Sequence, residues 1–430
     1  MRLLPALLLL ASCVKGNPES KDETFSDTGG VIEIPTCNYS ITTRVGAEAP
    51  RVGLPTLGSD PTPRNVHLGI VGDPQTSMVV QWRTADENET KATEIRFGVG
   101  ANLTAGQLTE TATGITFGYR ATGMQIYQVH QAHLCGLSPG TTYSYQVGAP
   151  GYYSPVYSFT TAPDIVANPD TEVVLALLGD SRDGYDVWEQ LAALMQARSP
   201  DLILFSGDAV TVGLAQYEWE EFFGRGEELL ARVPLVSAHG NHEVNAVNYY
   251  AQLAMPGDQE NFGIDYGHAH ITVANDSPDD IAKLTGEFRD ALAADFEASK
   301  DARWKLLMHH RPMWSASTRH GSNLMLQQSW GPLVDQYGID LVLSGHDHDY
   351  EVSKPLINGV AQSSNADATV YVVAGGAGAD LYGNGTGFWT EYSEKTYSGA
   401  VIRVRRDSLV MEAFRQDGTA IPVGFSKTKP

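Results

Sequence analysis

Five times between Leu177 and Tyr350, an apolar run ends abruptly in polar side chains of the metal-binding type. The five endings read Gly179-Asp180, Gly207-Asp208, Gly240-Asn241-His242-Glu243, His309-His310 and Gly345-His346-Asp347-His348. Nine of the 12 histidines lie between His239 and His348, so imidazole is concentrated where these carboxylates are. Carboxylate, amide and imidazole groups are the ligands that divalent cations take in proteins. The pattern therefore predicts a metal centre built at the ends of several strands.

Length and charge narrow the classes of protein further. The chain has 430 residues, enough for two or three domains with substantial cores. Its formal net charge is −22, from 51 acidic and 29 basic side chains. A field of that sign repels nucleic acid, so no nucleic-acid binding is expected. An anionic substrate stays compatible, because bound metal ions reverse the sign of the charge locally.

The N-terminus has the features of an export signal. Arg2 precedes an apolar segment, residues 3–10, that is too short to span a bilayer but suits a signal peptide. It ends in Leu10-Ala11-Ser12-Cys13, which resembles the lipobox of bacterial lipoproteins. We expect residues 1–12 to be a signal peptide and Cys13 to be lipidated; the alternative is a buried apolar N-terminus with a chance cysteine. The protein would then be exported and anchored to a membrane or cell surface only through Cys13, or secreted.

Residues 13–64 are interpreted as a tether and linker. Residues 14–30 are polar and residues 47–64 are rich in Pro and Gly, although a strand over residues 31–34 is compatible with the sequence. An exported location would allow Cys37 and Cys135 to form a disulfide. The alternative is two isolated buried thiols.

Residues 65–163 show short strands separated by turn signals. Alternation over residues 77–82 places Met78, Val80 and Trp82 on one face. The segment resembles a fibronectin type III sandwich, with Trp82 as its early core tryptophan and Tyr143 as a tyrosine corner. An all-β first domain without catalytic character is therefore expected.

From residue 170 to 415 apolar strands alternate with helical patterns. The expected strands are residues 173–178, 202–205, 234–238, 271–274, 305–308 and 340–343. Residues 187–198 have helical spacing, and residues 371–374 and 400–404 are expected to complete the second sheet. Repeated β-α-β units predict an α/β domain with active groups beyond the carboxyl ends of its strands. Residues 416–430 are interpreted as a C-terminal tail.

Taken in order, the five endings resemble the motifs of the calcineurin-like metallophosphoesterase superfamily. The preceding β domain makes purple acid phosphatase-like enzymes the nearest resemblance, which covers residues 65–415. The resemblance implies an αββα fold and hydrolysis of a small-molecule phosphate ester by a metal-bound hydroxide at a binuclear centre. It also implies two divalent cations, for which Mn, Zn, Fe(II) and Mg are all candidates.

The resemblance further implies a ligand set for each ion. Asp208 would bridge the two ions. The second ion would take Asp208, Asn241, His309 and His346, and the first would take Asp180, Asp208 and His348. In an extended segment residues i and i+2 point the same way, which suits His346 and His348 to adjacent ions.

Three histidines are candidates for other roles. His242 resembles the family's non-ligand histidine beside the leaving group, with Glu243 nearby to orient it. His320 lies in a loop where family members often place a substrate contact, and an unremarkable surface position is the alternative. His310 could support the ligands or simply pack.

Two positions depart from the family pattern. Thr211 stands where purple acid phosphatases have the tyrosine that binds ferric iron, so a colourless centre is expected. Arg182 stands where other members have a histidine ligand, and a guanidinium stays protonated. Arg182 could grip phosphate oxygens, or it could form an ion pair with Asp183, Asp186 or Glu243.

Two other functions stay open at this stage. The enzyme could be a diesterase acting on nucleotides or lipid head groups. Because the first site has three evident ligands, a surface-anchored binding module with a degenerate metal site is the alternative of another class.

Overall fold

The computed structural model describes residues 30–122, 125–278 and 280–430. The expected signal peptide over residues 1–12, Cys13 and the polar segment up to residue 29 lie outside these ranges. Within them, no helix is both long and apolar enough to cross a membrane.

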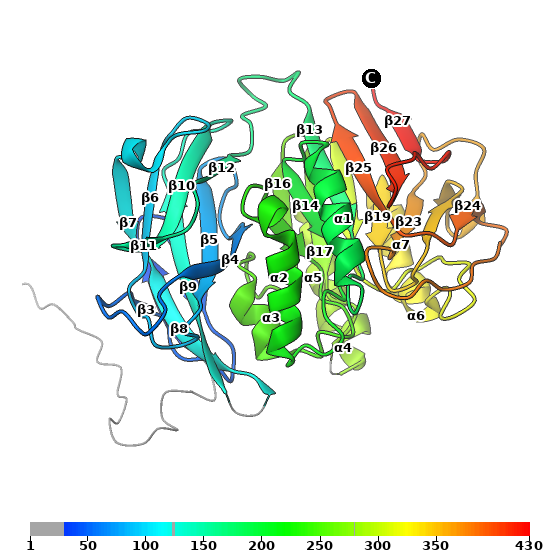
Figure 1. Ribbon diagram of the computed structural model, residues 1–430. Coiled ribbons are helices and arrows are strands. Elements are labelled where there is room, and N and C mark those ends of the chain that lie inside the picture. Colours follow the sequence, from blue (N-terminus) through cyan, green and yellow to red (C-terminus); the bar gives the residue numbers. More distant parts are fainter. Residues whose placement is uncertain (1–29, 123–124, 279) are drawn as a thin grey trace, which may run out of the picture.

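Two antiparallel sheets form the first domain, coloured blue to cyan in Figure 1. One has the strand order β3-β8-β9-β5-β4, and the other has β11-β10-β6-β7 with β12 also paired to β10. The strands are β3 (Arg51–Val52), β4 (Pro63–Gly69), β5 (Ser77–Thr84), β6 (Glu94–Val99), β7 (Glu110–Thr113), β8 (Ile115–Arg120), β9 (Ile126–Cys135), β10 (Thr142–Ala149), β11 (Tyr152–Tyr153) and β12 (Tyr157–Thr160), with a 3₁₀ turn η1 (Ala105–Gln107).

The predicted core of this sandwich is confirmed. Met78, Val80 and Trp82 are all buried and pack in one apolar cluster between the sheets. The hydroxyl of Tyr143 accepts a hydrogen bond from the backbone N–H of Ser138 at 2.9 Å, which is the tyrosine-corner arrangement.

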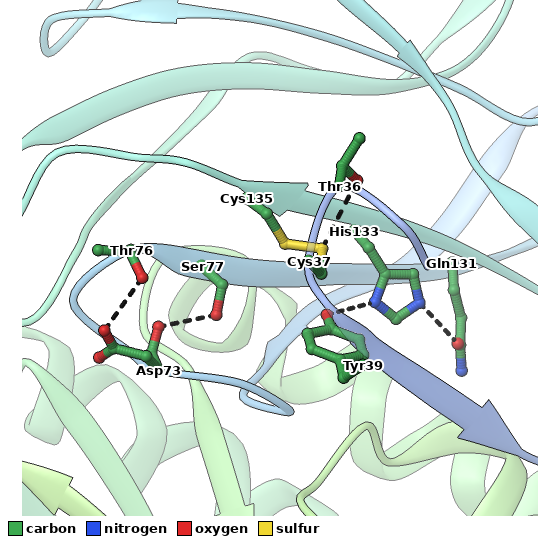
Figure 2. The surroundings of a disulfide bond; sticks show 9 residues. All are labelled: Thr36, Cys37, Tyr39, Asp73, Thr76, Ser77, Gln131, His133 and Cys135. Atoms are coloured by element: carbon green, nitrogen blue, oxygen red, sulfur yellow. Dashed lines mark hydrogen bonds between the residues drawn. A yellow bond between two sulfur atoms is a disulfide. The ribbon is translucent and has the colours of Figure 1, made fainter. Parts of the chain in front are cut away.

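Residues 31–64 are more ordered than the interpretation as a linker allowed. A hairpin of β1 (Val31–Ile34) and β2 (Tyr39–Thr42) precedes β3. Cys37, in the hairpin turn, is bonded to Cys135 at the end of β9, with the two Cα atoms 5.2 Å apart (Figure 2). Tyr39 adds a hydrogen bond between its hydroxyl and Nδ1 of His133 at 2.8 Å. These contacts connect the hairpin to the sandwich.

The second domain contains two large sheets, a six-stranded one with the order β15-β14-β13-β25-β26-β27 and a seven-stranded one with the order β16-β17-β18-β19-β23-β20-β24. The elements are β13 (Val173–Leu178), α1 (Tyr185–Gln196), β14 (Leu202–Phe205), α2 (Gln216–Leu230), β15 (Leu235–Ser237), α3 (Val247–Gln252), β16 (Asn261–Tyr266), β17 (Ala269–Ala274), α4 (Ala282–Thr285), α5 (Glu287–Ala298), β18 (Trp304–Met308), α6 (Leu324–Ser329), α7 (Gly331–Tyr337), β19 (Leu341–Ser344), β20 (Tyr350–Ser353), β21 (Leu356–Ile357), β22 (Val360–Ala361), β23 (Val370–Ala374), β24 (Thr390–Glu394), β25 (Ser398–Val404), β26 (Ser408–Arg415) and β27 (Phe425–Thr428).

Strand alternation produces the four layers of an αββα domain. In β18, Leu306 faces the core between the two sheets, whereas Leu307 faces a second cluster that includes Phe288 of α5 and Val334 of α7. On the other side, α1 and α2 cover the six-stranded sheet with Trp188 and Phe222, whose rings stack 5.0 Å apart. The predicted fold class, an all-β domain followed by an αββα domain, is confirmed.

Two expectations about the C-terminal region are wrong. The strand over residues 400–404 belongs to β25, which pairs antiparallel with β13 in the first sheet and not in the second. The expected tail contains β27, which pairs with β26 at the edge of that sheet. Because Lys427 is charged, the sequence suggests an exposed segment here. In the structure its ammonium is buried and pairs with Asp340 at 2.7 Å.

The two domains share a buried polar interface. All of β5 is buried, because the face opposite its core residues packs on the second domain. Gln81 donates to the carbonyl of Ala251 at 3.1 Å, and Arg83 forms an ion pair with Glu220 of α2. This interface lies on the α2 side of the second domain (Figure 1).

Candidate metal centre

The chain turns sharply where the strands deliver their polar residues. Asp180 follows β13, Asp208 follows β14 and His346 follows β19, and all three have left-handed backbones with φ of 62°, 56° and 66°. Non-glycine residues adopt this conformation rarely, and strain of this kind concentrates at functional sites. A Cβ added to Gly345 would lie 2.2 Å from Oδ2 of Asp180. Glycine is therefore needed there for the two loops to approach.

Asp208, His310 and His346 bring three ligand atoms within 4.8 Å of one another. Nε2 of His310 lies 3.3 Å from Oδ1 of Asp208 and 3.2 Å from Nδ1 of His346. Nδ1 of His310 contacts the carbonyl oxygen of Ser206 at 2.8 Å, which leaves Nε2 directed at the cluster. Burial alone would lower the pKa of His310, but Asp208 and other carboxylates raise it to about 10. The cluster thus attracts positive charge.

Asn241 has a buried amide oxygen that no described residue uses. Its Oδ1 has no hydrogen-bond partner among the described residues. A buried amide oxygen without a partner is costly unless a donor or a cation faces it. An amide oxygen, a carboxylate and two imidazoles form a donor set that fits a divalent ion.

Asp180 and His348 form a second pair of ligand-type side chains next to this cluster. Nε2 of His348 lies 3.6 Å from Oδ1 of Asp180, is buried, and has no hydrogen-bond partner within the described ranges. Nδ1 of the same ring contacts the carbonyl oxygen of Asp380 at 2.7 Å, so the Nε2 lone pair faces Asp180. Burial raises the pKa of Asp180. These groups also suit a cation, with Asp208 beside them.

His310, and not the expected ligand His309, belongs to the cluster of three. Nδ1 of His309 bonds Oδ2 of Asp276 at 2.9 Å, and its ring packs edge-on against Trp330 at 5.7 Å. Neighbouring residues in an extended segment point to opposite sides, so only one of the two can face Asp208. The expected ligand was His309, but the sequence does not show which residue of the pair faces the cluster. No sequence motif indicates Asp276, which bonds His309.

His242 is held by Thr211 and not by Glu243. Its Nδ1 contacts the carbonyl oxygen of Thr211 at 2.7 Å, and its Nε2 lies 3.9 Å from Oδ2 of Asp208. The side chain is 30% exposed, so it can meet a bound molecule. Glu243 instead accepts hydrogen bonds from the backbone N–H groups of Asp208, Ala209 and Gly240. These bonds connect the loop after β14 to the loop after β15.

Arg182 and His320 lie at the rim of the centre. Nε of Arg182 is 3.7 Å from Oδ2 of Asp208, and no ion pair with the expected partners Asp183, Asp186 or Glu243 is found within the described part of the chain. The exposed His320 packs its ring 4.2 Å from that of His346.

Tyr382 is a site residue that the sequence patterns missed. Its ring stacks on His348 with centroids 4.0 Å apart, and its hydroxyl accepts from Nη2 of Arg182 at 3.4 Å. It lies in the loop between β23 and β24, outside the five strand-end motifs, so none of those motifs identified it.

An αββα domain whose strand ends gather carboxylate, amide and imidazole donors is the architecture of a metal-dependent hydrolase. The family model described as Purple acid Phosphatase, N-terminal domain, matches residues 63–161, and the one described as Calcineurin-like phosphoesterase matches residues 173–350.

Individual relatives agree with these matches. Acid phosphatase type 7 of Mus musculus is 28% identical over 357 residues, covering 74% of this chain and 78% of that protein. Purple acid phosphatase 22 of Arabidopsis thaliana is 24% identical over 318 residues, covering 70% and 69%. The structure of purple acid phosphatase PPD1 from yellow lupin (Lupinus luteus) seeds matches with a TM-score of 0.73 at 16% identity, covering 86% of this chain and 75% of that one, which supports the fold.

The chain belongs to the calcineurin-like metallophosphoesterases and is purple acid phosphatase-like, with the N-terminal domain of that group. It is a phosphoester hydrolase, and its family implies divalent metal ions.

Proposed function

We propose that the protein hydrolyses phosphate monoesters at a centre of two divalent ions. The observation that carries the proposal is the convergence of carboxylate and imidazole ligand atoms, together with the buried Oδ1 of Asn241 and Nε2 of His348, which have no hydrogen-bond partner among the described residues. The second ion would take Asp208, Asn241, His310 and His346, and the first would take Asp180, Asp208 and His348. Bound there, the ions would supply Lewis acidity, which makes water nucleophilic near neutral pH and neutralises phosphoryl oxygens.

The protein side chains around the ions would orient the ester and move a proton. The Thr211 carbonyl fixes the ring of His242 through Nδ1, so Nε2 is free to bond a phosphoryl oxygen or protonate the leaving group. Arg182, which lies near the same Oδ2 of Asp208 as His242, would contribute its charge to phosphate oxygens. His320, exposed at the rim, would contact the substrate beyond the phosphate.

The test is hydrolysis by metal-stripped protein reloaded with Mn²⁺, Zn²⁺, Fe²⁺ or Mg²⁺. We expect p-nitrophenyl phosphate to be cleaved much faster than bis-p-nitrophenyl phosphate. The reverse preference would identify a diesterase. Bound metal without hydrolysis of either ester would overturn the proposal in favour of a binding module. Because Thr211 has no phenol, the loaded protein should be colourless.

We also propose that the protein is exported and anchored through Cys13. The Cys37–Cys135 bond supports an oxidising location, where disulfides persist. Mass spectrometry of the purified mature protein should find diacylglycerol on Cys13. An unmodified N-terminus beginning at Met1 would contradict this.

A further inference from the structure

Arg182 is fixed in place beside the centre. Its backbone N–H donates to the carbonyl of Asp208 at 3.3 Å, and its Nη2 donates to the hydroxyl of Tyr382 at 3.4 Å. Its Nε lies 3.7 Å from Oδ2 of Asp208 and has no hydrogen-bond partner among the described residues. The side chain is only 16% exposed. The guanidinium is therefore held in a largely buried position and cannot easily swing into solvent.

This position brings Arg182 close to one of the two proposed ions. A divalent ion bound to Oδ2 of Asp208 would lie about 2.2 Å from that oxygen. With Nε at 3.7 Å from the same oxygen, the ion and the guanidinium can be at most about 6 Å apart. Two cations repel strongly at that distance in a buried site, where the effective dielectric constant is far below that of water. Arginine cannot relieve the repulsion by losing its proton.

The repulsion falls unequally on the two sites. Oδ1 of Asp208 faces His310 at 3.3 Å, whereas Oδ2 faces Arg182. The site on the Oδ1 side has four protein donors, including Asn241 and His346. Arg182 is connected to the other site through Tyr382, whose hydroxyl it bonds and whose ring stacks on His348. That site would have three protein donors, Asp180, His348 and the shared Asp208, and Arg182 offsets one of its two carboxylate charges.

We infer that Arg182 makes the two metal sites unequal in affinity. The site of Asp208, Asn241, His310 and His346 holds its ion tightly, and the site of Asp180, Asp208 and His348 binds at least tenfold more weakly. This inference rests on the ligand sets of the proposed function. The charge that weakens metal binding at the first site also attracts phosphate. Arg182 therefore lowers the metal affinity of that site and raises its affinity for an anion.

Calorimetric titration of the metal-stripped full chain with Mn²⁺, without any substrate, tests the inference. The wild-type protein should show one tight ion and a second whose Kd is at least tenfold higher. In Arg182→Gln the weaker Kd should fall at least tenfold while the tighter Kd is unchanged. Arg182→Lys keeps the charge and serves as the matched control, with the difference retained. His348→Ala should abolish the weak phase alone.

Several results would overturn the inference. They are two wild-type ions with Kd values within threefold, an unchanged difference in Arg182→Gln, or loss of the tight phase in His348→Ala. The wild-type titration decides even if a variant folds poorly, which circular dichroism would reveal. Absence of phosphatase activity would sink the proposed function yet leave these metal affinities standing, so the two failures are distinguishable.

Discussion

Replacing His310 and His309 separately by alanine should produce opposite phenotypes. His310→Ala removes one of the four proposed protein donors of the tight site, the one 3.3 Å from Asp208 and 3.2 Å from His346. Changing a residue that merely supports a ligand costs about 10–100-fold in metal affinity, so losing a ligand should cost more than about 100-fold, or about 2.8 kcal/mol.

His309→Ala should leave the metal in place and weaken the fold. The side chain is fully buried, bonds Asp276 at 2.9 Å and packs on Trp330. Loss of a buried hydrogen bond to a charged group costs about 1.5–3 kcal/mol, and the cavity adds to that. We therefore expect about 3 kcal/mol of lost stability, with Mn²⁺ affinity within about threefold of wild type.

Both variants require the same two measurements, Mn²⁺ titration of metal-stripped protein and urea unfolding monitored by tryptophan fluorescence. Each variant is the control for the other, because the residues are adjacent and identical in type. Loss of metal binding in His309→Ala together with its retention in His310→Ala would refute the assignment. It would also mean that the side chains after β18 alternate in the opposite phase, so that His309 faces the cluster and His310 faces away from it.

Three further predictions concern stability. The pKa of His270 is raised to about 9 despite burial, by Asp265 at 2.7 Å and Asp295 at 3.0 Å. A folded pKa above the unfolded value of 6.5 means that this stabilisation is complete below about pH 6.5 and lost as pH rises through 9. The urea-unfolding difference between wild type and His270→Gln should thus shrink by about 1–2 kcal/mol over that range, after discounting the exposed Asp265; a flat difference would contradict this. Cys37→Ser with Cys135→Ser opens a loop whose ends are 98 residues apart and should cost about 2–5 kcal/mol, and a reducing agent should destabilise the wild-type protein but not the double variant. Asp340→Ala removes the carboxylate that pairs with the buried Lys427 and with Lys429, and it should cost about 3–5 kcal/mol in urea unfolding, whereas a cost below about 1 kcal/mol would show that the pairs are solvated.

The sequence predicted the fold class because its determinants are local. Continuous apolar runs identify buried strands such as β13 and β14, and alternation identifies strands with one apolar face, such as β5, whose polar face is buried only by the second domain. Sheet membership is not local. β25 is as apolar as a second-sheet strand, yet it pairs with β13, more than 200 residues earlier. β27 escaped detection because Lys427 reads as a surface residue until its distant partner Asp340 is known.

The donors of the metal centre could likewise be read from the sequence, since each is a side chain placed directly after a strand. What could not be read is which way each donor faces. The choice between His309 and His310 depends on the phase of the extended segment, and a shift of one residue reverses it. The parts that aim the donors are also hidden. The rings of His242, His310 and His348 are fixed by the carbonyl oxygens of Thr211, Ser206 and Asp380. Any residue type supplies a carbonyl, so the groups that orient this centre leave no trace in side-chain identity.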